Sequence, residues 1–278
     1  MARIVVVGGV NVDRVHRLAR PLVPGGRHGV LSVRLRAGGG GLVTGAVLAR
    51  MGHAVDLVCR MATDDPGLRA AAVARGLGLR LVSAGAPAGP TRPLDVLVDP
   101  QGERTILAPV DAEAEPIEGF EAGGADLVYV NVRRLGPDGV AALAAAPRSV
   151  AQVPLEAGER RPAGVLVAGR SDFPDRDVGA IRDLAASCRG VPSGLFVLTD
   201  GAGPVGIWED GVPLESVGPP ASVETHDSTG AGDAFAAGLI DALLRGCAPG
   251  EAVRAAREVA RHFLMERSRF LPEVLPET

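Results

Sequence analysis

The stretch D-S-T-G-A-G-D, residues 227–233, is followed directly by the mostly apolar run A-F-A-A-G-L-I-D-A-L-L-R-G, residues 234–246. Large apolar residues recur in this run at helical spacing, and Gly246 is suited to end a helix. The sequence therefore predicts that the glycine-rich stretch lies at the N-terminus of a helix.

A helix N-terminus of this kind attracts anions, because its first backbone N–H groups lack partners and the helix dipole is positive there. Gly230 and Gly232 carry no Cβ, so a phosphate can approach the backbone closely. Asp233 falls in the first turn, where a carboxylate would repel a bound phosphate. It is better explained as a base that takes a proton from an attacking hydroxyl. The simpler alternative is an ordinary helix cap, which accounts for one Asp and one Gly but not for the whole stretch.

Outward from this segment, β-branched runs alternate with Ala- and Leu-rich runs of helical length. We expect a mostly parallel central sheet with helices on both faces, which binds ligands at the carboxyl ends of its strands. The predicted strands cover residues 4–7, 54–59, 127–132, 149–153, 164–168 and 195–199, and the predicted helices residues 42–51, 67–76, 139–146 and 178–187.

Two segments interrupt this alternation. Residues 27–36 and 94–108 alternate polar and apolar side chains, and the second contains the turn D-P-Q-G at 99–102. Strands with one solvent-exposed face and one buried face do not belong in a sheet that helices cover on both sides. We predict a small antiparallel β lid, formed by segments of about 14–37 and 90–109, within a single domain spanning 1–278. Surface hairpins without a function are the alternative.

Composition excludes several classes of function. The 278 residues carry a net charge of −4, which disfavours a nucleic-acid partner. The chain contains no Lys, which excludes Schiff-base chemistry and a P-loop with its usual lysine. Its three Cys residues are far apart, which suits a reducing cytoplasm rather than a disulfide framework. No apolar run is long enough for a membrane span, so we expect a cytoplasmic protein.

The stretch D-S-T-G-A-G-D-A-F-A-A-G, residues 227–238, resembles the signature D-T-x-G-A-G-D-x-F-x-x-G of the ribokinase-like (PfkB) carbohydrate kinases. The resemblance implies an α/β ribokinase-like fold and an ATP-dependent kinase that phosphorylates a hydroxyl of a sugar or sugar-like molecule. It also implies Mg²⁺ and, in many relatives, K⁺ as cofactors. The family's catalytic base falls on Asp233, and its anion hole on the backbone amides of Gly230, Ala231 and Gly232.

Other site residues follow from the same resemblance. The substrate-binding positions match Asn11, Asp13, Gly38, Gly39 and Asn131, and the nucleotide-binding positions match Thr199 and Gly201. The metal-linked positions match Asp172 for Mg²⁺ and Asp227 with Thr229 for a monovalent cation. Arg170 departs from the family pattern, and our hypothesis is that it binds the nucleotide by neutralising phosphate charge in place of the lost metal-linked groups. From the residues alone, Asn11 and Asp13 after a parallel strand can bind hydroxyls, or they can close an Asx turn. The glycines before residue 42 can expose backbone to a ligand or act as a hinge.

Two departures from the family pattern bear on function. Val43 stands where an Asn usually contacts the sugar, which makes a simple pentose or hexose a less suitable substrate. The family's N-x-x-E element aligns with residues 169–172, where only the acid Asp172 remains. These losses motivate a second hypothesis, a weakly active or non-catalytic homologue that senses a metabolite or nucleotide.

A third hypothesis is a nucleoside kinase on the same fold, which the low aromatic content of 3% disfavours. A dinucleotide-dependent oxidoreductase is disfavoured as well, because Gly8-Gly9 does not form G-x-G-x-x-G. In relatives the β lid often forms a dimer contact, so the resemblance also implies a homodimer.

Overall fold

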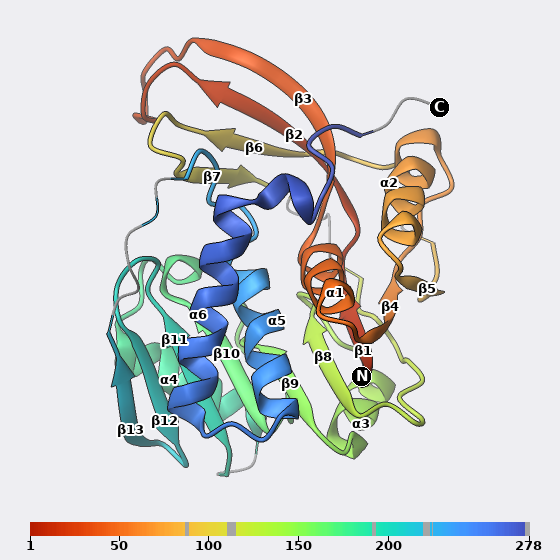
Figure 1. Ribbon diagram of the computed structural model, residues 1–278, viewed down its shortest axis with the longest axis vertical. Helices are drawn as coiled ribbons and strands as arrows, with labels where there is room; N and C mark the ends of the chain where they lie inside the picture. Colours follow the sequence, from red (N-terminus) through yellow and green to blue (C-terminus); the bar gives the residue numbers. More distant parts are fainter. Residues whose placement is uncertain (87–88, 110–114, 191–192, 219–222, 224, 276–278) are drawn as a thin grey trace.

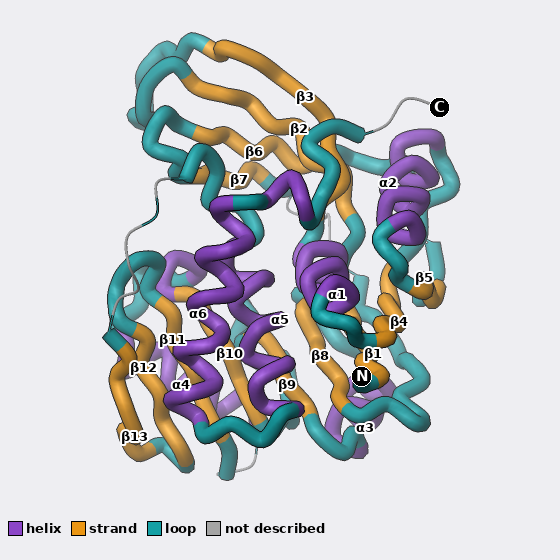
Figure 2. The backbone as a smooth tube through the Cα atoms, in the orientation of Figure 1, coloured by secondary structure: helices purple, strands orange, loops and turns teal. Residues whose placement is uncertain are grey.

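The computed structural model describes residues 1–86, 89–109, 115–190, 193–218, 223 and 225–275. Its main body is a nine-stranded sheet with helices on both faces, and a second sheet of four strands lies across one end (Figures 1 and 2). This is the predicted α/β ribokinase-like architecture. Among the described helices, none is both long and apolar enough to cross a membrane.

The central sheet is parallel from β11 to β5, and β12 and β13 add an antiparallel hairpin at one edge. In spatial order its strands are β13 (Val212–Val217), β12 (Val205–Glu209), β11 (Leu195–Thr199), β10 (Val165–Gly169), β9 (Ser149–Gln152), β8 (Leu127–Asn131), β1 (Arg3–Gly8), β4 (Ala54–Cys59) and β5 (Arg80–Ser83). The six predicted strands are confirmed. The sequence analysis missed β5 and the β12–β13 hairpin.

Strand β1 is buried on both sides, which explains its uninterrupted apolar sequence. Ile4 and Val6 pack into the core beneath α1, α2, α5 and α6, whereas Val5 and Val7 pack into the core beneath α3 and α4. The helices are α1 (Gly40–Arg50), α2 (Asp65–Gly76), α3 (Pro137–Ala145), α4 (Val178–Arg189), α5 (Ala231–Leu244) and α6 (Pro249–Met265), with short 3₁₀ turns η1 (Arg170–Asp172) and η2 (Arg267–Arg269).

The lid is the second sheet, in the order β3 (Val30–Gly38), β2 (Asn11–Leu18), β6 (Leu94–Val98) and β7 (Arg104–Leu107). Its β2–β3 and β6–β7 pairs are antiparallel, but β2 and β6 are parallel. The predicted purely antiparallel lid is therefore wrong in this pair, because a long segment of chain separates β2 from β6. The lid also begins earlier than predicted, so Asn11 and Asp13 lie on its first strand.

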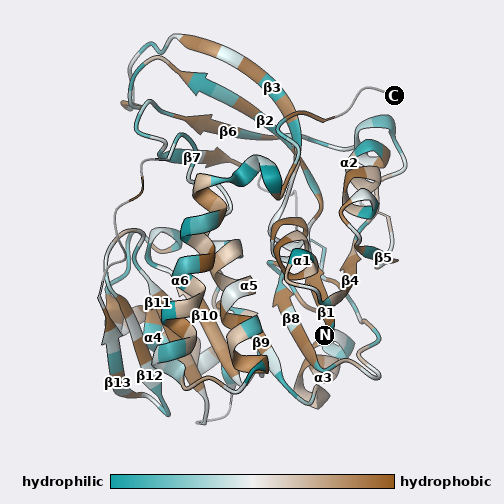
Figure 3. Ribbon diagram, in the orientation of Figure 1, coloured by the Kyte–Doolittle hydropathy of each residue, from teal (hydrophilic) through white to brown (hydrophobic). Residues whose placement is uncertain are grey.

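The two faces of the lid differ in chemistry. Asp13, Val96 and Arg104 lie on the face that meets the main body, where they line a cavity. Leu31 and Val33 lie on the opposite face and are 73% and 55% exposed. Figure 3 shows these apolar stretches along β3. One face of the lid thus belongs to the site and the other to the outer surface.

Candidate active site

A cavity of about 510 Å³ lies between the lid and the carboxyl ends of the central strands. It brings together the predicted residues Asn11, Asp13, Gly38, Gly39, Asn131, Asp172, Thr199, Gly201, Thr229, Gly230, Ala231, Gly232 and Asp233. These residues come from opposite ends of the chain, so the fold gathers into one place what the sequence motifs indicated separately. Arg170 does not line this cavity; its neighbours Ser171 and Asp172 do.

The glycine-rich stretch forms the start of α5, as its sequence predicts. Gly230 caps the helix with a φ of +90°, a backbone conformation that favours glycine, and Ala234 N donates to its carbonyl at 2.9 Å. A Cβ added to Gly232 would meet no atom within 4 Å, so the backbone is open on the cavity side. This helix start therefore fits a phosphate group bound by backbone amides.

Asp233 lies in the first turn of α5 and is held on two sides. Asn131 Nδ2, at the end of β8, donates to Asp233 Oδ1 at 3.0 Å, and Thr44 Oγ1 donates to the Asp233 carbonyl at 3.3 Å. Helix α1 packs closely here: a Cβ on Gly40 would lie 2.2 Å from Asn131 Nδ2 and 2.8 Å from Asp233 Oδ1. The carboxylate is thus fixed in direction while its remaining oxygen is available to a ligand.

The surroundings of Asp233 shift its titration. The pKa of Asp233 is raised to about 6, and burial is the main cause. The charge of Arg104 and the Asn131 hydrogen bond oppose this rise, whereas the carboxylates of Asp172 and Asp13 add to it. A carboxylate with a pKa near 6 is still ionised at neutral pH and is a stronger base than an exposed one. This is the property that a general base for a hydroxyl requires.

Asp13 lines the cavity and belongs to a buried cluster of charges. Arg36 Nε lies 3.5 Å from Asp13 Oδ2, and Arg36 Nη1 donates to Asp227 Oδ2 at 2.5 Å. All three side chains are buried, and so is Arg267 from η2. Burial raises the pKa of Asp13, although Arg36 and Arg267 oppose the shift. Arg36 thus links Asp13 to the signature stretch.

The position of Asp227 bears on the expected monovalent cation. Its Oδ2 is paired with Arg36, and its Oδ1 accepts the Thr229 amide at 2.9 Å. Although burial opposes ionisation, these contacts hold the pKa of Asp227 below its usual value. Since a guanidinium already neutralises this carboxylate, the arrangement does not fit a cation bound to Asp227.

Asp172 and Thr199 lie beside Gly169 in the lining of the cavity. A Cβ on Gly169 would be 2.9 Å from Asp172 Oδ2 and 3.7 Å from Thr199 Oγ1. Among the residues described, no group of three or more His, Cys, Asp or Glu side chains could hold a metal by itself. A single carboxylate at this place fits Mg²⁺ that arrives on nucleotide phosphates and keeps most of its water ligands.

Sequence reasoning did not identify Arg104, from β7, as a site residue. It lines the cavity, and its charge acts on both Asp233 and Asp172. The absence of lysine from the chain is the signal that could have found it, because any cation at the site must be an arginine. Arg36 was missed for a different reason: its contact with Asp227 joins residues 191 positions apart.

The lid touches the signature stretch directly. Gly102 lies at the tip of the β6–β7 hairpin, and its carbonyl accepts a hydrogen bond from Ser228 N at 2.9 Å. Arg17 Nη1, from β2, donates to the His226 carbonyl at 2.6 Å. Gly102 has a φ of +81°, and a Cβ there would lie 2.3 Å from the Thr225 carbonyl oxygen. The lid therefore rests on the loop that leads into α5.

One family model and many solved structures are similar to this chain. The model of the "pfkB family carbohydrate kinase" matches residues 179–267, which include the signature and α5. A search of curated protein sequences finds no match.

Solved structures with the same fold include a ribokinase from Thermotoga maritima, with 19% identity, a TM-score of 0.71 and coverage of 96% of this chain and 94% of that one. A microbiome-derived acarbose kinase has 22% identity and a TM-score of 0.71, with coverage of 94% and 92%. An adenosine kinase from Sinorhizobium meliloti has 17% identity and a TM-score of 0.72, with coverage of 95% and 94%. The ribokinase-like fold expected from the sequence is thereby confirmed, and the family model matches the segment that carries the signature.

Proposed function

Because this chain is a ribokinase-like protein whose residues 179–267 match the pfkB family of carbohydrate kinases, we propose that it transfers the γ-phosphoryl group of ATP to a hydroxyl of a sugar or sugar-like molecule. The observation that carries the proposal is the position of the Asp233 carboxylate. This carboxylate is oriented by Asn131 at a helix start suited to phosphate, in the same cavity as Asp13.

The roles of the residues follow from their positions. The acceptor hydroxyl lies between Asp13 and Asp233, with Asn11 and the Gly38–Gly39 backbone as further partners. Asp233 removes the hydroxyl proton as the oxygen attacks phosphorus, and the bond from phosphorus to the ADP oxygen breaks in line. The amides of Gly230, Ala231 and Gly232 donate to the phosphoryl oxygens as charge develops on them.

Two groups support the nucleotide. Thr199 and Gly201 line the part of the cavity assigned to ATP, and Asp172 would hold Mg²⁺ through its water ligands. Mg²⁺ neutralises phosphate charge when it is bound. Arg104 takes the role that the sequence analysis gave to Arg170, since it is the arginine whose charge reaches the carboxylates at the reaction centre. The lid excludes water and limits the transfer of phosphate to water.

The acceptor is better described as a sugar than as a nucleoside. Phe235 is the one aromatic side chain among the described residues that line this cavity, so a base would find little to stack on. Val43 lines the acceptor region in place of the usual Asn and removes one hydrogen-bonding group. A homodimer through the outer face of the lid stays a prediction, supported by the exposure of Leu31 and Val33.

The experiment that tests this function is ATP consumption over a panel of sugars, sugar acids and nucleosides. A kinase consumes ATP only with an acceptor and forms a phosphorylated product in equal amount. A metabolite sensor would bind ATP or a sugar but form no product with any member of the panel. Phosphorylation of a nucleoside in preference to every sugar would favour the nucleoside kinase instead.

A further inference from the structure

A second cavity, of about 470 Å³, adjoins the acceptor end of the first. The two cavities share the lining residues Gly9, Asn11, Leu94, Val132 and Arg133. The second cavity extends away from the helix start that would hold the nucleotide phosphates, between α2, the loop before β6 and the loop after β8. An acceptor with its hydroxyl at Asp233 can therefore reach past Asn11 into this space.

The two cavities differ in their balance of charge. The first is lined by the carboxylates of Asp13, Asp172 and Asp233 and by an equal number of guanidinium groups, those of Arg104, Arg133 and Arg267. The second is lined by the four arginines Arg60, Arg92, Arg133 and Arg134, and its described lining includes one carboxylate, that of Glu115. Guanidinium groups recognise carboxylate and phosphate groups by paired hydrogen bonds. The charge pattern therefore indicates an acceptor with a hydroxyl at one end and an anionic group at the other.

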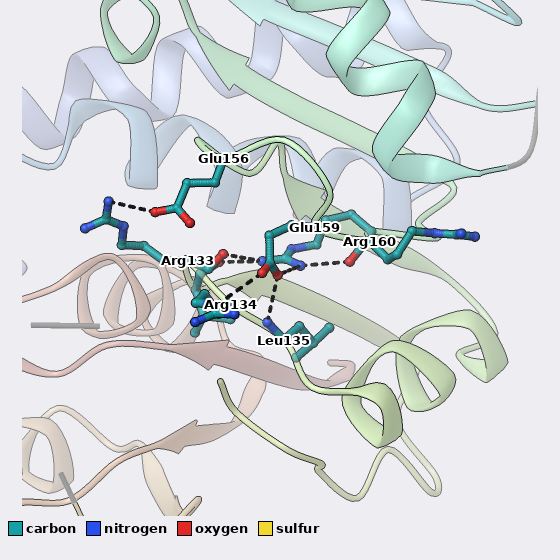
Figure 4. Close-up of polar contacts among 8 residues, drawn as sticks. Arg133, Arg134, Leu135, Glu156, Glu159 and Arg160 are labelled. Atoms are coloured by element: carbon teal, nitrogen blue, oxygen red, sulfur yellow. Dashed lines mark hydrogen bonds and ion pairs between the residues drawn. The ribbon is translucent and has the colours of Figure 1, made fainter. Parts of the chain in front are cut away.

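The loop that carries Arg133 and Arg134 is held by a buried arginine. Arg161 is 0% exposed, and its Nη2 donates to the carbonyls of Val132 and Arg133 at 2.8 and 2.9 Å. Glu159 pairs with Arg134 at 3.3 Å and accepts the Leu135 amide at 3.3 Å (Figure 4). A guanidinium is costly to bury unless its hydrogen bonds are made. This network fixes the direction in which the loop after β8 leaves the sheet.

Arg133 itself is held only weakly. Its Nη2 lies 3.3 Å from Glu156 Oε1, and the two side chains are 32% and 55% exposed (Figure 4). An exposed pair of this kind stabilises the fold by about 0–1 kcal/mol, so the guanidinium can exchange Glu156 for a ligand anion at little cost. Arg60 is different, since it also donates to the carbonyls of Ala86 and Pro116 and so forms part of the cavity wall.

We propose that the second cavity binds an anionic group, carboxylate or phosphate, on the acceptor substrate, and that Arg133 is the residue that selects for it. This inference rests on the proposed function and names its substrate class as acidic or phosphorylated sugars. Glu156 competes with the substrate for the same guanidinium. Removing Arg133 and removing Glu156 are therefore expected to have opposite effects.

The test compares a neutral sugar, the corresponding sugar acid and the corresponding sugar phosphate, with the wild type, Arg133→Gln and Glu156→Gln. Loss of a hydrogen bond to a charged group costs about 1.5–3 kcal/mol, so Arg133→Gln is expected to lower kcat/KM for the preferred anionic acceptor by about 10- to 100-fold. Glu156→Gln is expected to raise it and to leave kcat/KM for the neutral sugar unchanged. For Arg133→Gln, the loss is expected to be larger with the anionic acceptor than with the neutral sugar. If kcat/KM changes for the sugar acid, the bound group is a carboxylate. If it changes for the sugar phosphate, the bound group is a phosphate.

Arg148→Gln is the matched control, because it removes the same charge at the amino end of β9, away from the cavities, where Arg148 donates to the Leu244 carbonyl. Calorimetric binding of the three sugars separates this inference from the proposed function. If the wild type binds the anionic sugar through Arg133 but transfers no phosphate, the inference stands and the kinase function fails. Equal use of neutral and anionic sugars, or an Arg133→Gln variant that matches the wild type with all three, overturns the inference.

Discussion

Asp233 combines two properties at the residue scale: a fixed orientation and a raised pKa. Asn131 supplies the first, since its amide occupies one carboxylate oxygen, and burial supplies the second. Neither property can be read from the signature, because both depend on side chains brought in from β8 and the lid. The signature identifies the residue, and the fold gives it the environment of a base.

The rate of transfer is expected to depend on the ionisation of Asp233. A base must be deprotonated to accept a proton, so activity is present above its pKa and is lost as the pH falls through about 6. The measurement is a profile of kcat/KM between acid and neutral pH with saturating ATP. A flat profile through this range, in an enzyme that stays folded, would contradict the role of Asp233.

Arg104→Gln is expected to move that profile. Arg104 lowers the pKa of Asp233, so its removal leaves the carboxyl harder to ionise and shifts the acid limb to higher pH. Its removal also leaves the phosphoryl charge less well neutralised, which lowers kcat. Arg104→Lys keeps the charge and is expected to restore the position of the limb. If the acid limb of the pH profile lies at the same pH in Arg104→Gln as in the wild type, Arg104 does not act on Asp233.

At the scale of elements, the tip of the lid hairpin contacts the signature loop. Gly102 and Ser228 form the backbone hydrogen bond of this contact, and the packing leaves no room for a side chain at Gly102. The lid is therefore placed by the same loop that orders the start of α5. We predict that closing the acceptor site and forming the phosphate site are coupled by this contact.

Gly102→Ala tests the coupling. It adds about 1–2 kcal/mol of backbone strain at positive φ and a clash with the Thr225 carbonyl, so the hairpin is expected to lift and the KM for the acceptor to rise. ATP hydrolysis without acceptor is expected to increase relative to transfer. Gly25→Ala is the control: it has a φ of +77° in the lid but open space around its Cβ. Equal kinetics for the two variants would exclude the coupling.

Arg36 lies on β3 of the lid and pairs with Asp227 of the signature. Asp227 is the carboxylate that was expected to hold a monovalent cation. We therefore predict equal rates in potassium, sodium and choline chlorides at one ionic strength. Arg36→Met removes the guanidinium that contacts both buried carboxylates, Asp13 and Asp227, and is expected to lower the free energy of unfolding by about 3–5 kcal/mol in urea denaturation.

Arg34→Met, on the same strand and half-buried, serves as the control and is expected to cost less. A wild-type enzyme that requires potassium, or an Arg36→Met variant as stable as Arg34→Met, would contradict this account of the charge cluster.

At the scale of the whole molecule, the sequence predicts what depends on local pattern. Buried parallel strands such as β1 carry unbroken apolar runs, and the signature has the composition of a phosphate-binding helix start, so the central sheet, α5 and Asp233 were predicted. The β12–β13 hairpin and β5 were missed, because their mixed exposure gives them no uniform pattern.

What could not be predicted depends on contacts between distant segments. The parallel pairing of β2 with β6 joins strands about eighty residues apart, as the Arg14–Asp95 contact shows with a separation of 81. The Arg36–Asp227 pair and the place of Arg104 above the carboxylates arise in the same way. The lid and the charges that it contributes are therefore products of tertiary structure, whereas the nucleotide side is encoded in one short motif.

The most direct test of the central claim is transfer of labelled γ-phosphate from ATP to the sugar panel by the wild type and by Asp233→Asn. We expect the wild type to label at least one sugar, and Asp233→Asn to lower the rate by about 10²- to 10⁴-fold, the usual contribution of a general base, with ATP binding and thermal stability retained. Equal labelling by the two proteins, or ATP binding without labelling of any sugar, would contradict the claim.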